Sequence, residues 1–274
     1  MATFESSLKS RLIYVFAIQD EWHKDCLKIG ETTLEEDHGD FPAPCSDTLN
    51  KAARKRIDQY TTTAGIAYTL LYTEMTVFFK KTICSFNDKQ VHSVLERSGV
   101  KKKLFDTVKG ANEWYCCDLE TVKKAIAAVK QGLTSLHPGD ISTTLNPIIF
   151  RPEQQAAIDK TKKVFSRGNQ MLWNAKMRFG KTLCALRVAR DLEMKRTMIL
   201  THRPVVDEGW FEDFGKIFYD RPDYHYGSRT KGESFKALEY LASKGDRYVY
   251  FASMQDMRGS ELVGGKFDKN NELF

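Results

Sequence analysis

A strand–loop–helix pattern between residues 170 and 193 constrains the fold of this chain more than any other segment. The apolar run QMLWN (170–174) is followed by the loop AKMRFGKT (175–182), and apolar residues then recur at helical spacing over 181–193. The run predicts a strand, and the recurrent pattern predicts a helix. A loop that leads into a helix N-terminus presents backbone N–H groups and the positive end of the helix dipole, which attract phosphate groups. We therefore expect an α/β domain with an anion site at this turn.

The neighbouring segments continue the alternation of helix and strand. The pattern predicts a helix over 153–165 and strands over 197–201 and 247–252. Apolar strands separated by helices of this length indicate a parallel sheet. Residues 151–274 are therefore expected to form a parallel α/β domain.

The loop resembles the Walker A motif of superfamily 2 helicases of the DEAD/DEAH type, with Ala175 at the position of the first glycine. This resemblance implies a RecA-like motor domain that binds ATP with Mg²⁺. Gly180 would bring the backbone close to the nucleotide, Lys181 would reach the β- and γ-phosphates, and the Thr182 hydroxyl would bind Mg²⁺. A chance Gly-Lys-Thr at the start of a helix is the alternative interpretation.

Two flanking segments match further motifs of the same superfamily. RPEQ at 151–154 resembles its adenine-reading glutamine motif, and the amide of Gln154 can both donate to and accept from an adenine edge. MILTHRP at 198–204 resembles motif Ia, which implies that Thr201, His202 and Arg203 donate to the phosphates of a nucleic acid. A solvated glutamine and a polar strand end are the plainer interpretations.

The acidic pair of such a motor is not found after any apolar strand between Lys181 and Phe274. The strand predicted near 248–253 is followed by Met254, Gln255 and Asp256 instead of Asp-Glu. We therefore expect the RecA-like domain to be incomplete, ending before the Walker B pair, and to bind ATP weakly without turning it over.

The first half of the chain has a different pattern. Strands are predicted over 11–17, 26–29 and 67–73, and a helix over 49–60. Two more helices should start near Asn87 and Asp118, and Asp118 suits an N-cap position. This combination indicates a small mixed α+β domain.

A stretch rich in Pro, Gly, Ser and Thr separates the two halves at 132–147. We expect a first domain at 1–132, a linker at 133–150 and a second domain at 151–274.

Five short motifs in the first domain occur in the order of one enzyme family. They are LIY (12–14), KIG (28–30), RIDQY (56–60), DKQVH (88–92) and EWY (113–115). Together they resemble the GIY-YIG endonuclease superfamily, in the branch whose second motif reads KIG.

The resemblance assigns roles in metal-dependent hydrolysis of a phosphodiester. Tyr14 would orient or deprotonate the attacking water, with help from Lys28. Arg56 would neutralise the phosphate, for which a guanidinium fork is well suited. Asp88 would hold a single Mg²⁺, and His92 would share its helix face.

Three of these residues also have a purely structural interpretation, and the sequence departs from the family pattern at three places. Tyr14 can be a core aromatic residue, Arg56 part of a basic helix face, and Asp88 a helix cap. Leu12 replaces the glycine of GIY, Asp88 replaces a glutamate, and residues 31–53 form a longer link than is common in the family.

The composition limits the kinds of binding partner and the cellular compartment that we expect for this chain. A formal net charge of +6 favours a polyanion. No run of eighteen apolar residues is present, the N-terminus has no apolar signal region, and six cysteines show no CxxC spacing. Reduced thiols in the cytoplasm are therefore expected.

Three functions follow from these observations. The first is a Mg²⁺-dependent endonuclease for duplex DNA fused to an ATP-dependent helicase or translocase motor, as in restriction or phage-defence enzymes. The second is a degenerate nuclease domain that only binds DNA and targets the motor. The third, an ATP-gated protein-interaction switch without nucleic acid, fits the basic clusters less well. Those clusters are Lys51, Arg54, Lys55 and Lys101 to Lys103.

Overall fold

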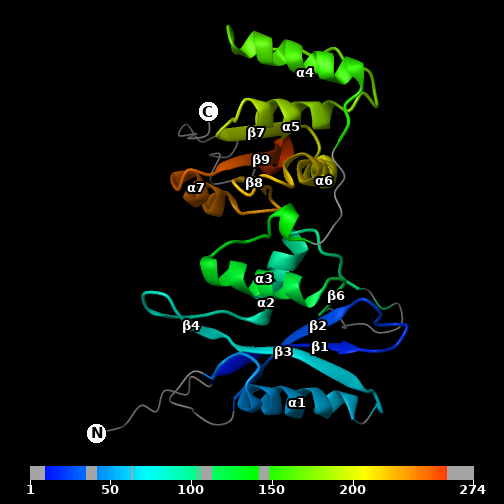
Figure 1. The fold of residues 1–274 in the computed structure, drawn as a ribbon, viewed down its shortest axis with the longest axis vertical. Coiled ribbons are helices and arrows are strands. Elements are labelled where there is room, and N and C mark those ends of the chain that lie inside the picture. The colour runs from blue at the N-terminus through cyan, green and yellow to red at the C-terminus, as the bar shows by residue number, and fades with distance from the viewer. Residues whose placement is uncertain are drawn as a thin grey trace. The chain divides into compact units, whose positions relative to one another are not determined.

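The computed structural model describes residues 10–34, 42–62, 64–103, 105, 113–141 and 148–257. The chain divides into two compact units, Met1–Leu133 and Thr134–Phe274, each with its own core (Figure 1). Within the described residues, no helix is long and apolar enough to span a membrane.

The first unit is built on a four-stranded antiparallel sheet. Its strands are β1 (Arg11–Ile18), β2 (Leu27–Thr33), β3 (Tyr68–Met75) and β6 (Trp114–Tyr115), in the order β3-β1-β2-β6. The three strands expected from the sequence are confirmed. β2 is longer than predicted because its polar end continues to pair with β1 as far as Thr33.

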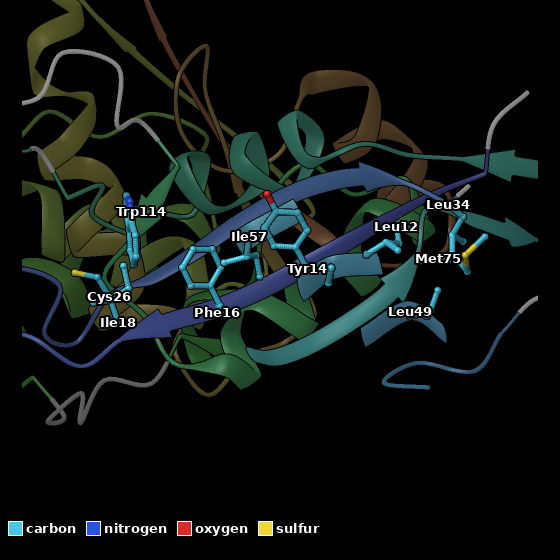
Figure 2. Packing of buried hydrophobic residues seen from close by; sticks show 11 residues of the cluster. Leu12, Tyr14, Phe16, Ile18, Cys26, Leu34, Leu49, Ile57, Met75 and Trp114 are labelled. Atoms are coloured by element: carbon cyan, nitrogen blue, oxygen red, sulfur yellow. The ribbon is translucent and has the colours of Figure 1, made fainter. Parts of the chain in front are cut away.

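Helix α1 (Asp47–Thr61) covers one face of this sheet. Alternate residues of β1, together with residues of α1, form a buried apolar cluster that can be followed in Figure 2. Its members from these two elements are Leu12, Tyr14, Phe16, Ile18, Leu49, Ala53 and Ile57. Because side chains alternate along a strand, Ile13 and Val15 point to the other face, where they are also buried.

Helices α2 (Asp88–Arg97) and α3 (Leu119–Gln131) lie on the side of the sheet opposite α1 (Figure 1). Both start where the sequence predicted. Asn87 caps α2 through a reciprocal pair of hydrogen bonds with Gln90, and the Asp118 carboxylate accepts from the backbone N–H of Thr121 at 2.8 Å. These caps satisfy N–H groups that have no partner inside the helix.

A short hairpin joins β3 to α2. It consists of β4 (Val77–Phe79) and β5 (Ile83–Ser85), which pair with each other as a separate two-stranded sheet. The sequence patterns did not predict it, because each strand has only three residues.

The second unit contains a parallel sheet, as its sequence predicts. The strands β7 (Arg196–Thr201), β8 (Tyr224–Gly227) and β9 (Arg247–Ser253) are ordered β7-β9-β8. β8 was not foreseen. Its two tyrosines are buried against the α6 phenylalanines Phe214 and Phe218.

Two helices of this unit were predicted and are confirmed, namely α4 (Pro152–Phe165) and α5 (Lys181–Asp191). The sequence patterns did not predict α6 (Asp207–Phe218), α7 (Phe235–Ser243), the short α8 (Met254–Met257) or the single turns η1 (Pro138–Asp140) and η2 (Pro204–Val206). Helices α4 and α5 pack on each other, as do α5 and α6.

The strand predicted at 170–174 is wrong. These residues have no regular secondary structure, and the Leu172 side chain is 90% exposed. A strand needs a neighbour to pair with its backbone, and no strand within the described residues pairs with this segment. It is held instead by Trp173, whose indole N–H donates to Thr161 Oγ1 at 2.7 Å.

Hydrogen bonds to Glu233 anchor the first residues of the stretch that joins the two halves. Glu233, which is 2% exposed, accepts hydrogen bonds from the backbone N–H and the hydroxyl of both Thr134 and Ser135, at 2.6 to 3.0 Å. Thr134 and Ser135 are therefore part of the second unit.

Candidate functional sites

The two signature motifs of the first unit meet on neighbouring strands. Tyr14 of LIY lies opposite Gly30 of KIG in the register of β1 and β2. The Tyr14 side chain runs across Gly30, so that a Cβ at position 30 would lie 2.7 Å from the phenol oxygen. Position 30 is therefore restricted to glycine by the ring that crosses it.

The Tyr14 hydroxyl belongs to a small polar group at the surface of the core. It lies 3.5 Å from the Tyr60 hydroxyl of α1. Burial raises the pKa of Tyr14, although its hydrogen bond with Tyr60 and the charge of Arg56 oppose the rise. Burial and the contact with Tyr14 also raise the pKa of Tyr60. Both phenols are therefore protonated at neutral pH.

Arg56 lies on α1 beside this group and lines a cleft of about 720 Å³. It donates to Gln59 Oε1 at 2.8 Å, which orients its guanidinium. Among the described residues, four cationic side chains and one carboxylate line the cleft, namely Arg11, Lys51, Lys55, Arg56 and Glu31. A concave surface with this excess of positive charge suits a phosphate backbone.

Lys28 reaches the same group from β2. Its ammonium lies 5.0 Å from the centre of the Tyr60 ring and 3.4 Å from Glu113 Oε2. Tyr60 thus contacts both Lys28 and Tyr14. The structure brings these residues together, and it adds Tyr60 and Glu113, which the sequence placed in matching motifs without giving them a role.

Asp88 is the first residue of α2 but does not cap it, because Asn87 has that function. The alternative interpretation of Asp88 as a helix cap is therefore wrong. Its backbone N–H donates to Glu31 Oε2 at 3.4 Å, and the other oxygen of Glu31 pairs with Arg11 at 3.0 Å. Glu31 directly follows the KIG motif and was missed, since nothing in the sequence indicates that it faces α2.

His92 is tied to the sheet. Its Nε2 lies 3.0 Å from the carbonyl oxygen of Ile29, which requires a proton on that nitrogen, and its ring packs on Tyr115. The role of His92 in catalysis stays a prediction, and this contact gives it a structural one as well.

The donor set near Asp88 restricts the metals that can bind. Across the residues that the structure describes, no group of three or more His, Cys, Asp or Glu side chains is placed to hold a metal ion. A zinc centre needs about four such ligands, whereas Mg²⁺ is commonly held by one or two carboxylates and water. The Asp88 carboxylate is a ligand of the kind that Mg²⁺ takes, whereas Glu31 contacts the Asp88 backbone and pairs with Arg11.

The residues of the predicted Walker A loop lead into the N-terminus of α5. Gly180 has φ +88°, a conformation that favours glycine, and no side chain caps the helix. The first N–H groups of α5 are therefore open to an anion. Lys181 folds over the loop, with its ammonium donating to the carbonyls of Ala175 (3.1 Å) and Lys176 (2.9 Å), and Thr182 follows in the first turn.

Gln154 braces this loop from the start of α4. Its amide oxygen accepts from Arg151 N–H at 2.8 Å, and its amide nitrogen donates to Phe179 O at 2.7 Å. A Cβ at Gly180 would lie 2.5 Å from that nitrogen. The side chain is 8% exposed, so the residue predicted to read adenine also fixes the shape of the loop.

The predicted nucleic-acid residues follow β7. The Thr201 hydroxyl donates to the carbonyl of Arg203 at 3.0 Å, and the side chains of His202 and Arg203 are exposed. At the end of β9, Ser253 donates to the Asp256 carboxylate at 2.6 Å, and Arg229 pairs with it from the other side. These carboxyl ends share one edge because the strands are parallel.

Two comparisons relate this chain to restriction enzymes, and the family match lies in the second unit. Residues 147–273 match the family model described as "Type III restriction enzyme, res subunit". The chain is also 29% identical over 125 residues to "Putative type II restriction enzyme and methyltransferase RM.MpnORF110P C-terminus" of Mycoplasma pneumoniae. That match covers 43% of this chain and 17% of the relative. No solved structure matches. The second unit, with its parallel sheet and phosphate loop, is thus similar to the helicase-like subunit of restriction enzymes.

Proposed function

We propose that the first unit is a GIY-YIG-type, Mg²⁺-dependent endonuclease domain for duplex DNA. It is linked to the nucleotide-binding part of an ATP-dependent helicase or translocase motor, in an enzyme of the restriction or defence type. The observation that carries the nuclease proposal is the crossing of Tyr14 over Gly30, beside Arg56 and the basic cleft. Two motifs that are separate in sequence pack against each other there, next to the surface formed by Arg56 and the cleft.

The arrangement suits hydrolysis of a phosphodiester. A protonated Tyr14 hydroxyl can hold a water by accepting its hydrogen, and Lys28 with Tyr60 supports the polar group around it. The Arg56 guanidinium would bind the non-bridging oxygens of the phosphate. Mg²⁺ at Asp88 would supply Lewis acidity toward the developing charge.

Leu12, the departure in the first motif, does not obstruct this surface. Its side chain is fully buried in the cluster under α1, beside Leu49 and Met75 (Figure 2). The glycine of the family pattern is thus replaced by a residue that fills the core.

In the second unit we propose that the N–H groups at the start of α5 and the Lys181 ammonium bind the triphosphate, and that the Thr182 hydroxyl binds Mg²⁺. Thr201, His202 and Arg203 would contact the DNA backbone. The similarity of residues 147–273 to restriction-enzyme res subunits supports ATP and DNA as ligands.

The rival function is DNA docking by a degenerate nuclease. The shorter carboxylate at Asp88 favours this rival. Similarity to restriction enzymes counts against the third possibility, a switch that acts on proteins alone.

Cleavage of supercoiled and linear duplex DNA by the whole chain, with Mg²⁺ or Mn²⁺, separates these functions. The wild type should nick or cut, and Arg56→Ala should abolish cleavage at unchanged thermal stability. Lys24→Ala, which removes an exposed cation of the first unit outside the cleft, is the matched control and should cut normally. A wild-type chain that binds DNA but stays inert with both metals supports docking instead.

A further inference from the structure

The β4–β5 hairpin presents an apolar pair to solvent. Phe79 and Ile83 lie opposite each other across the two strands, and their side chains are 74% and 70% exposed. The turn between them carries Lys80 and Lys81, which are also exposed. The tip of the hairpin is therefore both apolar and doubly cationic.

Folding of the unit does not explain this tip. The hairpin is anchored through its other face, where Phe78 packs edge-on against Phe86 with ring centres 6.1 Å apart. Phe79 and Ile83 add nothing to that contact. Isolated two-stranded hairpins are marginally stable, and exposed apolar edges invite aggregation. Two large apolar side chains at the exposed tip of a hairpin therefore indicate a surface that a partner covers.

The root of the hairpin lies at the proposed nuclease site. Thr76 donates from its N–H and its hydroxyl to the Arg11 carbonyl, at 2.9 and 3.0 Å, and accepts from Phe86 N–H at 2.9 Å. Arg11 pairs with Glu31, which in turn accepts from Asp88 N–H. A strand of three residues extends roughly 10 Å, so the tip lies about that far from this root.

We infer that the hairpin is a DNA wedge, in which Lys80 and Lys81 bind backbone phosphates while Phe79 and Ile83 enter the minor groove beside the phosphodiester held at the cleft. The inference rests on the proposed function. Lysines complement the phosphate charge, and apolar side chains flanked by cations are used by minor-groove proteins to part base steps. Arg11, at the same root, also lines the cleft together with Lys51, Lys55 and Arg56, so a duplex bound in the cleft meets cations on this side of the unit.

Binding of a short fluorescent duplex by the full chain, with Ca²⁺ in place of Mg²⁺, tests this wedge. The double variant Lys80→Gln/Lys81→Gln should bind roughly tenfold more weakly and lower the slope of log K against log salt by about two. Phe79→Ser/Ile83→Ser should weaken binding at unchanged slope and reduce the unstacking signal of 2-aminopurine in the duplex. Trp22→Ser/Lys24→Gln, an exposed pair elsewhere on the first unit, is the matched control and should change neither.

The outcomes separate this inference from the proposed function. Hairpin variants that bind like wild type, while Arg56→Ala loses cleavage, overturn the wedge and leave the nuclease standing. A wild-type chain without affinity for duplex DNA overturns both. Binding to anionic lipid vesicles that the hairpin variants alone abolish, with DNA binding unaltered, would assign the tip to a membrane surface and also refute the wedge.

An independent feature concerns two thiols at the edge of the sheet. Cys26 and Cys116 flank the Leu27–Tyr115 pair of β2 and β6, and their Sγ atoms lie 3.0 Å apart. Cys26 is buried beside Trp114 (Figure 2), whereas Cys116 is exposed. Only Cys116 is accessible to an oxidant in solution.

We propose that peroxide converts this pair to a disulfide. Cys116 sulfur takes one peroxide oxygen to become a sulfenic acid, with release of water, and Cys26 sulfur then attacks it and expels a second water. The bond would fix the start of β2 to the end of β6, next to the Lys28–Glu113 ion pair.

Mass spectrometry of peroxide-treated protein checks the pairing. The wild type should lose two hydrogens and give a Cys26–Cys116 cross-linked peptide that dithiothreitol separates. Cys117→Ser, at the neighbouring thiol, should behave the same, whereas Cys26→Ser should leave oxidised Cys116 unpaired. A Cys116–Cys117 link, or oxidation without any link, would refute the proposal.

Discussion

The phenol ring of Tyr14 occupies the space above Gly30 in which any side chain at position 30 would have to lie. Two residues sixteen positions apart therefore constrain each other across β1 and β2. The ring of Tyr14 leaves no room for a side chain at position 30, and the missing side chain of Gly30 leaves the space that this ring fills.

Gly30→Ala should displace Tyr14 because its Cβ would lie 2.7 Å from the hydroxyl oxygen. We expect a loss of about 1–3 kcal/mol in the free energy of unfolding, as for other overpacked cores, together with loss of DNA cleavage. Urea denaturation and a nicking assay measure the two effects. Gly209→Ala, where an added Cβ meets nothing within 4 Å, is the control and should leave both unchanged or slightly raise stability. Normal cleavage by Gly30→Ala would show that Tyr14 need not hold this position.

Glu31→Gln should reduce cleavage strongly while duplex DNA affinity stays within roughly threefold of wild type. The change removes the charge beside Asp88 that pairs with Arg11, but an amide oxygen can still accept from Asp88 N–H. Single-turnover cleavage rates and binding isotherms separate the two quantities. The exposed Glu21→Gln provides the comparison. Equal rates for the two variants would remove Glu31 from the site.

Lys181→Ala should weaken Mg·ATP binding by roughly tenfold, since a charge-assisted contact with the phosphates is lost. Lys176→Ala, at an exposed loop residue that contributes its carbonyl to Lys181, should bind normally. Titration with a fluorescent ATP analogue measures the affinity. The chain itself should show no DNA-stimulated ATPase activity, because no Asp-Glu pair follows β9. Turnover that Lys181→Ala removes would place a catalytic acid elsewhere in the chain.

The second unit should lose stability in acid through Asp223. Its hydrogen bonds with Arg221 lower its pKa from 3.8 to about 2, and the charge of Arg247 acts in the same direction. Because the folded-state pKa is the lower one, the stabilisation is present above pH 3.8 and declines as the pH falls toward 2. Asp223→Asn should therefore have a lower melting temperature than wild type at neutral pH. Its melting temperature should also fall less than that of wild type between pH 3.8 and 2. Glu212→Gln, at an exposed site, should follow wild type.

Local patterns were sufficient for most elements of the fold. The helix starts near Asn87 and Asp118 were predictable because a cap depends only on residues three positions away, although the cap of α2 is Asn87 and not the suggested Asp88. The strand predicted from the apolar run at 170–174 was wrong because a strand needs a second strand to pair with. The pattern of the run itself does not show whether such a strand is present. The hairpin at Val77–Phe79 and Ile83–Ser85 was too short to produce a periodic signal.

The candidate sites were foreseen as motifs but not as contacts. The motif order placed Tyr14, Lys28 and Arg56 in one domain, and the structure adds that Tyr60 touches the first two. Glu31 accepts from the Asp88 N–H because α2 packs against β2 at this point. The spacing of motifs along the sequence does not predict that packing. Likewise, the hydrogen bond from the Gln154 amide to the Phe179 carbonyl follows from tertiary packing alone.

The most direct test of the nuclease proposal is Mg²⁺-dependent cleavage of duplex DNA by Asp88→Asn and Asp88→Glu beside wild type. An asparagine keeps the shape but loses the charge that Mg²⁺ needs, whereas glutamate keeps the charge and restores the longer side chain of the family pattern. We expect wild type and Asp88→Glu to cut, and Asp88→Asn to bind DNA with wild-type affinity but not to cut. Cleavage by Asp88→Asn at the wild-type rate, or none by wild type while it binds DNA, would contradict it.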